Sequence, residues 1–433
     1  MTQQTALELL KMGRNVFLTG AAGSGKTYVL NQYINYLKWN DVMVATTAST
    51  GIAATHLGGV TIHSYSGIGI RSTISEKDIK NILGKPYVKN KIQSTKVLLI
   101  DEISMLSASR LDMVERVFRA GKNQDLPFGG VQVILCGDFF QLPPVTRDQS
   151  EDARFAYDSD IWPQMNLSIC YLSEQHRQAS DSLTGILNQI RSGQAGEGVV
   201  DALSERYQKE VDGLATPTKL YTHNIDVDSI NNKQLGTLSG NTKTFNMSST
   251  GIKELCEILK KSCLAPETLN LKVGSQVMFV KNNFDKGYVN GTLGEIVGFE
   301  KNSDPIVKLL NGETVVASAE TWLLQEENVV KAQISQIPLR LAWAITVHKS
   351  QGMSLDAAEI DLSKAFVPGM GYVALSRLRT LSGLKLVGFS EMALKVSEEV
   401  LKKDMEFQRD SMEEEMLVLN TPKMTKELSL IHI

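Results

Sequence analysis

A glycine-rich segment near the N-terminus constrains this chain most strongly. Residues 20–27 read GAAGSGKT and fit the pattern G-x-x-x-x-G-K-[ST], directly after an apolar run and directly before a stretch with helical spacing. Glycines let the backbone curl so that its amide groups face a phosphate, and the following helix adds the positive end of its dipole. We therefore predict a strand, a phosphate-binding loop and a helix. The predicted nucleotide contacts are Gly20, Ala21, Ala22, Gly23, Ser24, Gly25, Lys26 and Thr27, with Lys26 on the β- and γ-phosphates and Thr27 on Mg²⁺.

An acidic pair at the end of another apolar run belongs to the same chemistry. Residues 98–100 read LLI and lead directly into Asp101 and Glu102. A strand here would deliver Asp101 toward Mg²⁺ at the carboxyl edge of the sheet, and Glu102 would stand where a base polarises the attacking water. With the phosphate loop upstream, this pair predicts hydrolysis of a nucleoside triphosphate, without indicating its purpose.

Short apolar runs within the first 145 residues predict an α/β fold. Each run is bounded by turn or helix signals, as expected of strands buried on both faces of a parallel sheet. Helical stretches alternate with them, which is typical of an α/β layer. The predicted strands include residues 16–18, 42–45, 97–100 and 133–136.

The pattern changes further along the chain. A second αβ unit begins near Tyr171, and residues 269–334 show short strand-like runs separated by turns such as Asn290-Gly291, which predicts a small β-rich insertion. The end of the chain is helical and then polar, and residues 428–433 match what a common transposon-adaptor DNA encodes, so we expect a sequencing scar there. The first helix of the second unit should be capped by Asp181, ended by Gly193, and apolar at Leu183, Ile186, Leu187 and Ile190.

Composition excludes several classes of protein. Lys plus Arg number 45 against 48 Asp plus Glu, and 42% of residues are hydrophobic, which is ordinary for a globular chain. There is no apolar run of the ~18 residues that a membrane span needs, no signal-peptide pattern, and no C-x-x-C pair among the four cysteines. We expect a soluble, reduced, cytoplasmic protein, nucleoid-associated if bacterial. A near-neutral net charge still permits a local basic groove for nucleic acid.

Several stretches, in a fixed order, resemble superfamily 1 helicases of the Pif type, in the 5′→3′ branch that also holds RecD-like and Dda-like enzymes. The resemblance implies two RecA-like P-loop domains with a small SH3-like β-barrel inserted in the second, and no accessory domain ahead of them. The first RecA-like domain would comprise residues 1–170 and contain a pin or wedge at about 64–96. The second would comprise residues 171–268 and 335–395, with the insertion at 269–334 and a tail at 396–433. The stretches are 13–20, 101–105, 127–132, 136–144, 172–178, 346–352 and 372–377.

The resemblance also implies roles around the nucleotide. Gln141 resembles the sensor that links the γ-phosphate to the DNA side, and its amide can both donate and accept. Arg177 and Arg377 resemble the two arginines that the second domain places on the γ-phosphate, a role that suits the bidentate guanidinium. Gly352 matches a backbone contact near the same phosphate. Gln3 matches the glutamine that reads adenine, with Gln4 as the alternative.

The implied DNA contacts come from both domains. Hydroxyl groups and backbone amides hold phosphates without reading bases. Arg116 and Arg119 recur with Lys122 at every third residue, which fits a basic DNA face or a solvated helix stripe. The remaining predicted contacts are Thr46, Thr47, Ser49 and Thr50, then Thr61 and His63, and from the second domain His348, Lys349 and Ser350.

The sequence thus predicts an ATP-dependent DNA helicase that uses ATP and Mg²⁺. We expect a monomer that translocates on single-stranded DNA, 5′→3′ by family resemblance, and unwinds tailed or forked duplexes in repair, recombination or telomere and replication maintenance. Alternatives remain: a single-strand translocase or protein-stripping ATPase with little unwinding, an RNA substrate, or a regulatory P-loop ATPase independent of DNA. The pairing of Arg177 with Arg377 argues against the last, since a simple switch needs one arginine finger at most.

Overall fold

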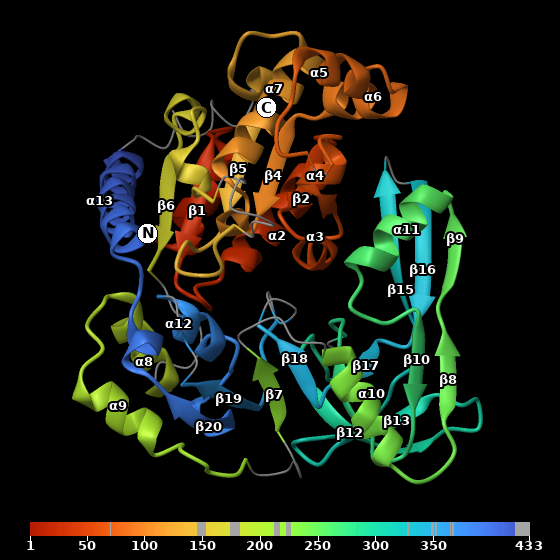
Figure 1. Cartoon of the computed structure of the whole chain (residues 1–433). Coiled ribbons are helices and arrows are strands. Elements are labelled where there is room, and N and C mark those ends of the chain that lie inside the picture. Colours follow the sequence, from red (N-terminus) through yellow and green to blue (C-terminus); the bar gives the residue numbers. More distant parts are fainter. Residues whose placement is uncertain are drawn as a thin grey trace. The chain divides into compact units, whose positions relative to one another are not determined.

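The computed structural model divides into two compact units, residues 1–179 with 398–433 and residues 180–397 (Figure 1). Each unit is described by itself. The described residues are 1–69, 71–144, 153–173, 182–211, 217–221, 227–283, 285–326, 329–347, 350, 353–363, 365 and 368–420.

The core of unit 1 is a six-stranded sheet in the order β3-β2-β4-β5-β1-β6. Every pairing in it is parallel, and β1 and β5 are buried along their whole length. The predicted doubly covered parallel sheet is confirmed. Its last strand pairs with β1, so the first unit continues past Tyr171, where we predicted the second to begin. The strands are β1 Val16–Gly20, β2 Val44–Ala48, β3 Val60–Thr61, β4 Val97–Asp101, β5 Gln132–Cys136 and β6 Ser168–Leu172.

Helices cover the sheet of unit 1 and connect its strands. The apolar residues of α2 recur at helical spacing and are buried against β1 and β2. The segment predicted as a pin forms two short helices, α5 and α6, packed on α7. The helices are α1 Gln3–Lys11, α2 Lys26–Trp39, α3 Gly51–His56, α4 Ile62–Tyr65, α5 Glu76–Leu83, α6 Pro86–Ser94 and α7 Ala108–Lys122, with 3-10 turns at Ile103–Met105, Pro127–Gly130, Ala156–Asp158 and Trp162–Met165.

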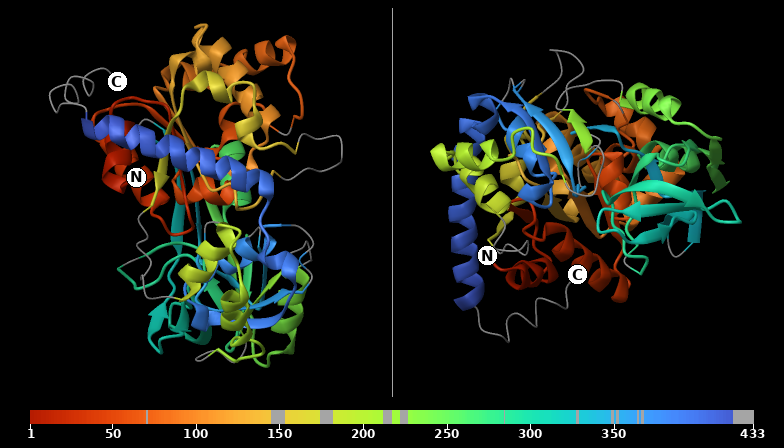
Figure 2. Two further views of the ribbon diagram at one scale, coloured as in Figure 1. Left: turned by 90° about the vertical axis from the view of Figure 1, so that its left-hand side faces the viewer. Right: turned by 90° about the horizontal axis from the view of Figure 1, so that it is seen from below.

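The helix α13, Glu398–Asn420, follows unit 2 in the chain but packs on unit 1. It packs against β6 and crosses that strand, as the left view of Figure 2 shows. The phenyl ring of Phe407 joins an aromatic cluster with Phe17 and Trp162. The sequence predicted the helical character of this tail and missed that it belongs to the first unit. The suspected scar, residues 428–433, lies outside the described residues.

Unit 2 contains a four-stranded parallel sheet in the order β18-β7-β19-β20. The predicted helix near its start is present as α8, which buries Leu183, Ile186, Leu187 and Ile190, and Gly193 follows in a left-handed conformation. Its predicted cap, Asp181, lies outside the described residues. The elements are β7 Thr218–Tyr221, β18 Ala344–Thr346, β19 Ala358–Leu362, β20 Leu384–Phe389, α8 Ser182–Arg191, α9 Glu197–Ser204, α10 Val227–Thr237 and α12 Met370–Leu375, with 3-10 turns at Leu381–Gly383 and Glu391–Leu394.

A β-rich part of unit 2 contains the predicted insertion. Its largest sheet is antiparallel, in the order β14-β13-β12-β11-β17, over a core of its own. Strand pairing extends this part back to Lys243, earlier than the predicted boundary at 269, because β8 pairs with β10 and β9 pairs with β16. The elements are β8 Lys243–Asn246, β9 Ser248–Gly251, α11 Lys253–Ser262, β10 Thr268–Leu271, β11 Gln276–Phe279, β12 Leu293–Phe299, β13 Pro305–Leu309, β14 Thr314–Val316, β15 Glu320–Glu326, β16 Val329–Gln336 and β17 Leu339–Leu341.

None of the helices in the described part of the chain combines the length and the apolarity that crossing a bilayer requires.

Candidate functional site

The glycine-rich loop joins β1 to α2, as predicted. Gly25 has a φ of 87° and forms the N-cap of α2, a conformation that glycine adopts without strain. The ammonium group of Lys26 donates to the carbonyl oxygens of Gly20 at 2.8 Å and Ala21 at 3.0 Å. The cation is therefore held within the loop, where the backbone amides of a phosphate site would also point.

Gln3, at the start of α1, lies against this loop. Its Nε2 donates to the carbonyl oxygen of Ser24 at 3.0 Å, and a Cβ added to Gly25 would lie 2.0 Å from the same nitrogen. Gln4, the alternative base reader, is exposed and donates to Glu8 on its own helix at 3.4 Å. The geometry favours Gln3 over Gln4 for the predicted contact with the base.

The acidic pair ends β4 in a strained conformation. Glu102 has φ 52° and ψ 47°, and its amide donates to the Asp101 carboxylate at 2.8 Å. A non-glycine residue held in this left-handed region costs on the order of 1–3 kcal/mol and is typical of functional sites. Burial raises the pKa of Asp101, while hydrogen bonds from the Glu102 amide and the Cys136 thiol and the charge of Lys26 oppose that rise.

The oxygen donors present suit Mg²⁺. Among the described residues, no group of three or more His, Cys, Asp or Glu side chains could hold a metal ion. Mg²⁺ is normally bound by one or two carboxylates together with phosphate and water rather than by a full protein cage. Asp101, with the hydroxyl group of Thr27 in the first turn of α2, matches that donor set.

The predicted sensor follows β5 in a tightly bonded turn. The amide of Gly137 donates to Leu18 of β1 at 3.1 Å, and the carboxylate of the fully buried Asp138 accepts from Phe140 at 3.1 Å. The amide of Gln141 then donates to the carbonyl oxygen of Asp138 at 2.9 Å. Gln141 therefore comes from the same sheet edge as the phosphate loop and the acidic pair.

The loop after β2 contacts the acidic pair, which corrects two predictions. The hydroxyl group of Thr47 is fully buried and donates to Leu99 at 2.6 Å. Ser49 is only 8% exposed; its amide donates to the carbonyl oxygen of Asp101 at 3.0 Å and its hydroxyl to that of Glu102 at 2.6 Å. Both hydroxyl groups serve the neighbouring strand instead of facing a DNA phosphate. Thr46 and Thr50 are half-buried and stay predicted contacts.

The second predicted strand-binding segment forms the short helix α4. The hydroxyl group of Thr61 accepts from Ser64 at 3.2 Å and caps that helix. The Nε2 of His63 is buried and has no hydrogen-bond partner among the residues that the structure describes. Burial, assisted by the charge of Arg110, lowers the pKa of His63 to about 4, so its ring is neutral near pH 7.

The basic stripe of α7 is engaged within unit 1, and the predicted DNA face is not supported. Arg116 donates to Ile74 at 2.8 Å and to Glu76 at 2.6 Å. Arg119 is held by Glu115 and Asp125 at 2.6 and 3.0 Å. The side chain of Lys122 donates to two carbonyl oxygens, those of residues 93 and 95. The stripe fastens α7 to its neighbours while the side chains of Arg116 and Arg119 stay partly exposed, which fits the predicted solvated stripe better than a DNA face.

In unit 2, Arg377 and Ser350 lie together. Arg377 is 4% exposed and donates to Val373 at 3.2 Å, to Ser376 at 3.0 Å and to the carbonyl oxygen of Ser350 at 3.5 Å. Ser350 is fully buried and donates to Val347 at 2.9 Å, so its hydroxyl group is not offered to DNA as predicted. The predicted residues Arg177, His348, Lys349 and Gly352 lie outside the described residues.

These features define a class: a P-loop nucleoside triphosphate hydrolase with two units, each built on a parallel sheet, whose first unit carries the loop and the acidic pair. Comparison with known proteins gives the family. The family model described as PIF1-like helicase matches residues 3–193, and that of the DNA helicase Pif1 2B domain matches residues 254–299. The ATP-dependent DNA helicase Pif1 of a Psychrobacter species is 46% identical over 95% of this chain and 72% of its own length.

Solved structures agree with this assignment. The Bacteroides sp Pif1 complex with ADP-AlF4 has a TM-score of 0.78 and 31% identity over 94% of this chain and 96% of that one. Bacteroides Pif1 bound to ssDNA has a TM-score of 0.65 and 33% identity over 93% and 95%. The chain spans 62% of the length of human PIF1, which it also matches. It belongs to the PIF1-like helicase family of ATP-dependent DNA helicases, which confirms the predicted family, the two RecA-like domains and the enzyme class, while the SH3-like character of the insertion stays a prediction.

Proposed function

We propose that this chain hydrolyses ATP with Mg²⁺ to move 5′→3′ along single-stranded DNA and to unwind tailed or forked duplexes. One observation supports this best: Ser49, in the segment that resembles a strand-binding loop, bonds directly to the backbone of Asp101 and Glu102. A motor needs such a connection, because each change at the nucleotide must alter the grip on the strand.

The roles at the nucleotide are divided among this chain's own residues. Lys26 and the loop amides bind the phosphates, and Gln3 contacts the base. Thr27 and Asp101 would hold Mg²⁺, which neutralises phosphate charge when it is bound. Glu102 accepts the proton of the attacking water. The remaining roles, γ-phosphate sensing and charge stabilisation, belong to Gln141, Arg177 and Arg377.

The DNA side of the proposal uses fewer residues than the sequence suggested. Thr46, Thr50 and Thr61 remain, with His348 and Lys349 from unit 2, and backbone amides supply further phosphate contacts. The structural relatives support this substrate, since one is Bacteroides Pif1 bound to ssDNA and another concerns forked dsDNA and two coordinating Pif1 helicases. We propose a monomer as the translocating unit and a role in repair, recombination or telomere and replication maintenance, both by analogy with the family.

The test combines ATP turnover, with and without single-stranded DNA, with separation of 5′- and 3′-tailed duplexes. We expect DNA to stimulate turnover and only the 5′-tailed duplex to be separated. Glu102→Gln is the matched control, because it keeps the shape of the side chain and removes the base; it should bind ATP and separate nothing.

Each alternative has its own result in this assay. DNA-independent turnover would indicate a regulatory ATPase. Stimulated turnover without strand separation would indicate a translocase or a protein-stripping enzyme, and equal stimulation by RNA would indicate that the sugar is not read.

A further inference from the structure

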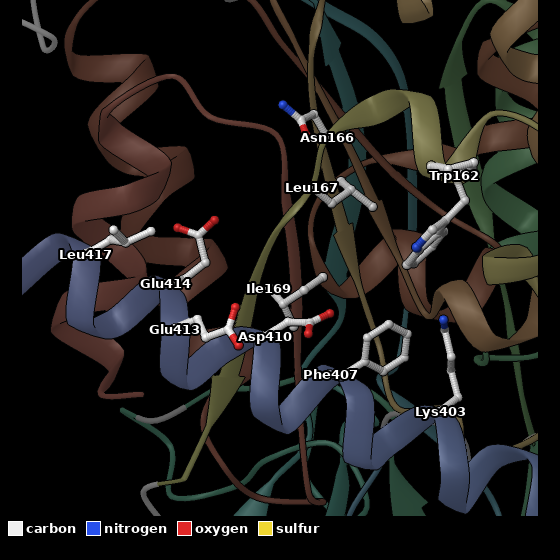
Figure 3. Close-up of a pocket in the computed structure, with 11 residues that line it drawn as sticks. Trp162, Asn166, Leu167, Ile169, Lys403, Phe407, Asp410, Glu413, Glu414 and Leu417 are labelled. Atoms are coloured by element: carbon white, nitrogen blue, oxygen red, sulfur yellow. The ribbon is translucent and has the colours of Figure 1, made fainter.

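The last turns of α13 are held against unit 1 by particular polar contacts. A pocket of about 360 Å³ lies between α13 and the segment that enters β6, with Trp162, Asn166 and Ile169 among its lining residues from that segment (Figure 3). Beyond Phe407 the helix is fixed by Ser411, which accepts from the Tyr171 amide at 3.0 Å, and by Glu414, which binds Arg14 at 2.8 Å and Ser168 at 3.2 Å. The next residue along the helix is Glu415.

Glu415 contacts the start of α1. Its Oε1 accepts from the backbone amide of Thr2 at 3.3 Å, and its other oxygen lies 3.5 Å from the Met1 amino group. Thr2 is the N-cap of α1, and its hydroxyl accepts from Thr5 at 3.1 Å. The first turn of α1 carries no acidic residue of its own. A carboxylate is favoured beside the unpaired amides and positive dipole end of a helix N-terminus, so Glu415 supplies from a distant element what α1 lacks.

The residue after Thr2 is Gln3, whose side chain lies on the phosphate loop. The Gln3 side chain is closely packed there, because its Nε2 lies 3.0 Å from the Ser24 carbonyl oxygen and fills the space beside Gly25. A small shift of the first turn of α1 would therefore move Gln3 out of position. A chain of contacts runs from Glu415 through Thr2 to Gln3 and the loop.

We propose that Glu415 is a positioning residue for recognition of the nucleotide base: by holding the start of α1 it places Gln3, and so sets the preference of this enzyme for ATP over GTP. The inference rests on the proposed function, in which Gln3 contacts the base. Glu415 touches no nucleotide itself.

The experiment measures kcat and KM for ATP and for GTP at saturating single-stranded DNA, using the full chain. Glu415→Ala should raise the KM for ATP roughly three- to tenfold, the range expected for losing one or two hydrogen bonds, with kcat near wild type and GTP constants little changed. The ATP/GTP ratio of kcat/KM should fall by the same factor. Glu415→Gln, which keeps an acceptor oxygen for Thr2, should retain most of that ratio.

Two further variants separate positioning from general docking of the helix. Glu414→Ala removes the neighbouring contacts to Arg14 and Ser168 and should leave the ATP/GTP ratio at the wild-type value. In the double variant Gln3→Ala/Glu415→Ala, the ratio should be no lower than in Gln3→Ala alone, because both changes remove the same contact.

The outcomes are distinguishable. If Gln3→Ala lowers the ATP/GTP ratio and Glu415→Ala does not, the positioning role is wrong while the proposed function stands. If Glu414→Ala lowers the ratio as much as Glu415→Ala, the effect belongs to helix docking and the proposal fails. If Gln3→Ala leaves the ratio unchanged, the base-reading role in the proposed function is itself wrong.

Discussion

Ser49→Ala should lower DNA-stimulated ATP turnover while leaving DNA binding largely intact. The serine is 8% exposed, and its hydroxyl donates at 2.6 Å to the carbonyl oxygen of Glu102. That carbonyl belongs to a residue at φ 52°. Alanine keeps the backbone bond from residue 49 to Asp101 and removes only the hydroxyl contact, so the change isolates one connection between the β2 loop and the acidic pair.

The size of the effect follows from two opposing terms at Glu102. A hydrogen bond contributes a net ~0.5–1.5 kcal/mol, whereas the left-handed conformation costs on the order of 1–3 kcal/mol. The bond thus offsets a substantial part of the strain. Losing it should let Glu102 leave the conformation that turnover requires, and we expect DNA-stimulated kcat to fall roughly three- to tenfold. The KM for ATP should change little, because the loop and Lys26 are untouched.

The assay compares DNA-stimulated turnover with single-stranded DNA affinity at two salt concentrations. Thr50→Ala is the matched control, because Thr50 lies in the same loop and its hydroxyl accepts only a local contact from Ala53 among the bonds described; it should weaken DNA binding more than turnover. Ser49 is a strand contact, and does not act through Glu102, if Ser49→Ala binds DNA several-fold more weakly and turns over at the wild-type rate once it is saturated with DNA.

Two further predictions concern buried groups. Arg377→Lys should lower DNA-stimulated turnover by on the order of 10³-fold with little effect on ATP affinity, since an ammonium cannot form the bidentate fork of an arginine finger. If Arg377→Lys turns over at the wild-type rate, Arg377 does not contact the γ-phosphate. The pKa of His63 is lowered from 6.5 to about 4, so the unfolded chain binds more protons than the folded chain between these pH values. The free energy of unfolding is therefore highest above pH 6.5 and decreases as the pH falls toward 4. The full difference is at most about 3 kcal/mol, and His63→Gln should flatten the loss of unfolding free energy between pH 7 and 5 in urea titrations; an unchanged pH dependence would show that His63 is protonated at little cost.

The sequence predicts those helices, strands and loops that are marked by residues close to one another in the chain. The phosphate loop, β4 and α8 each combine an apolar periodicity with a start or stop residue, and the structure reproduces them. The strands of the β-rich insertion were found by their turns, since Gly291 and Gly312 adopt the left-handed conformations those turns need. The roles of Gln3 and the acidic pair at the nucleotide stay predictions, that of Gln3 from the family resemblance and that of the acidic pair from its place after a strand downstream of the phosphate loop.

Contacts between distant segments were not predictable in this way. Whether Thr47 and Ser49 face DNA or the protein depends on which strand lies beside β2, and the sequence does not state that order. For Arg116 and Arg119, the sequence does not distinguish a DNA contact from a solvated stripe, because their partners Glu76, Glu115 and Asp125 are identified only in the folded structure. The docking of α13 depends on Glu414 and Glu415, which read in the sequence as part of an acidic run typical of a solvated tail.

The order of strands in unit 1 explains how this site connects nucleotide and DNA. In a parallel sheet every loop that follows a strand emerges at one edge, so strand order becomes the order of functional elements. Read across the sheet, β1 carries the phosphate loop, β5 leads to the sensor, β4 carries the acidic pair, and β2 and β3 lead to the two predicted strand-binding segments. The acidic pair therefore lies between the phosphate loop and the predicted strand-binding segments, next to β2 by the pairing of Ala48 with Asp101. In the proposed motor, a change in charge at the phosphates would reach the predicted strand-binding segments through β4, to which the hydroxyl groups of Thr47 and Ser49 bond from the β2 side.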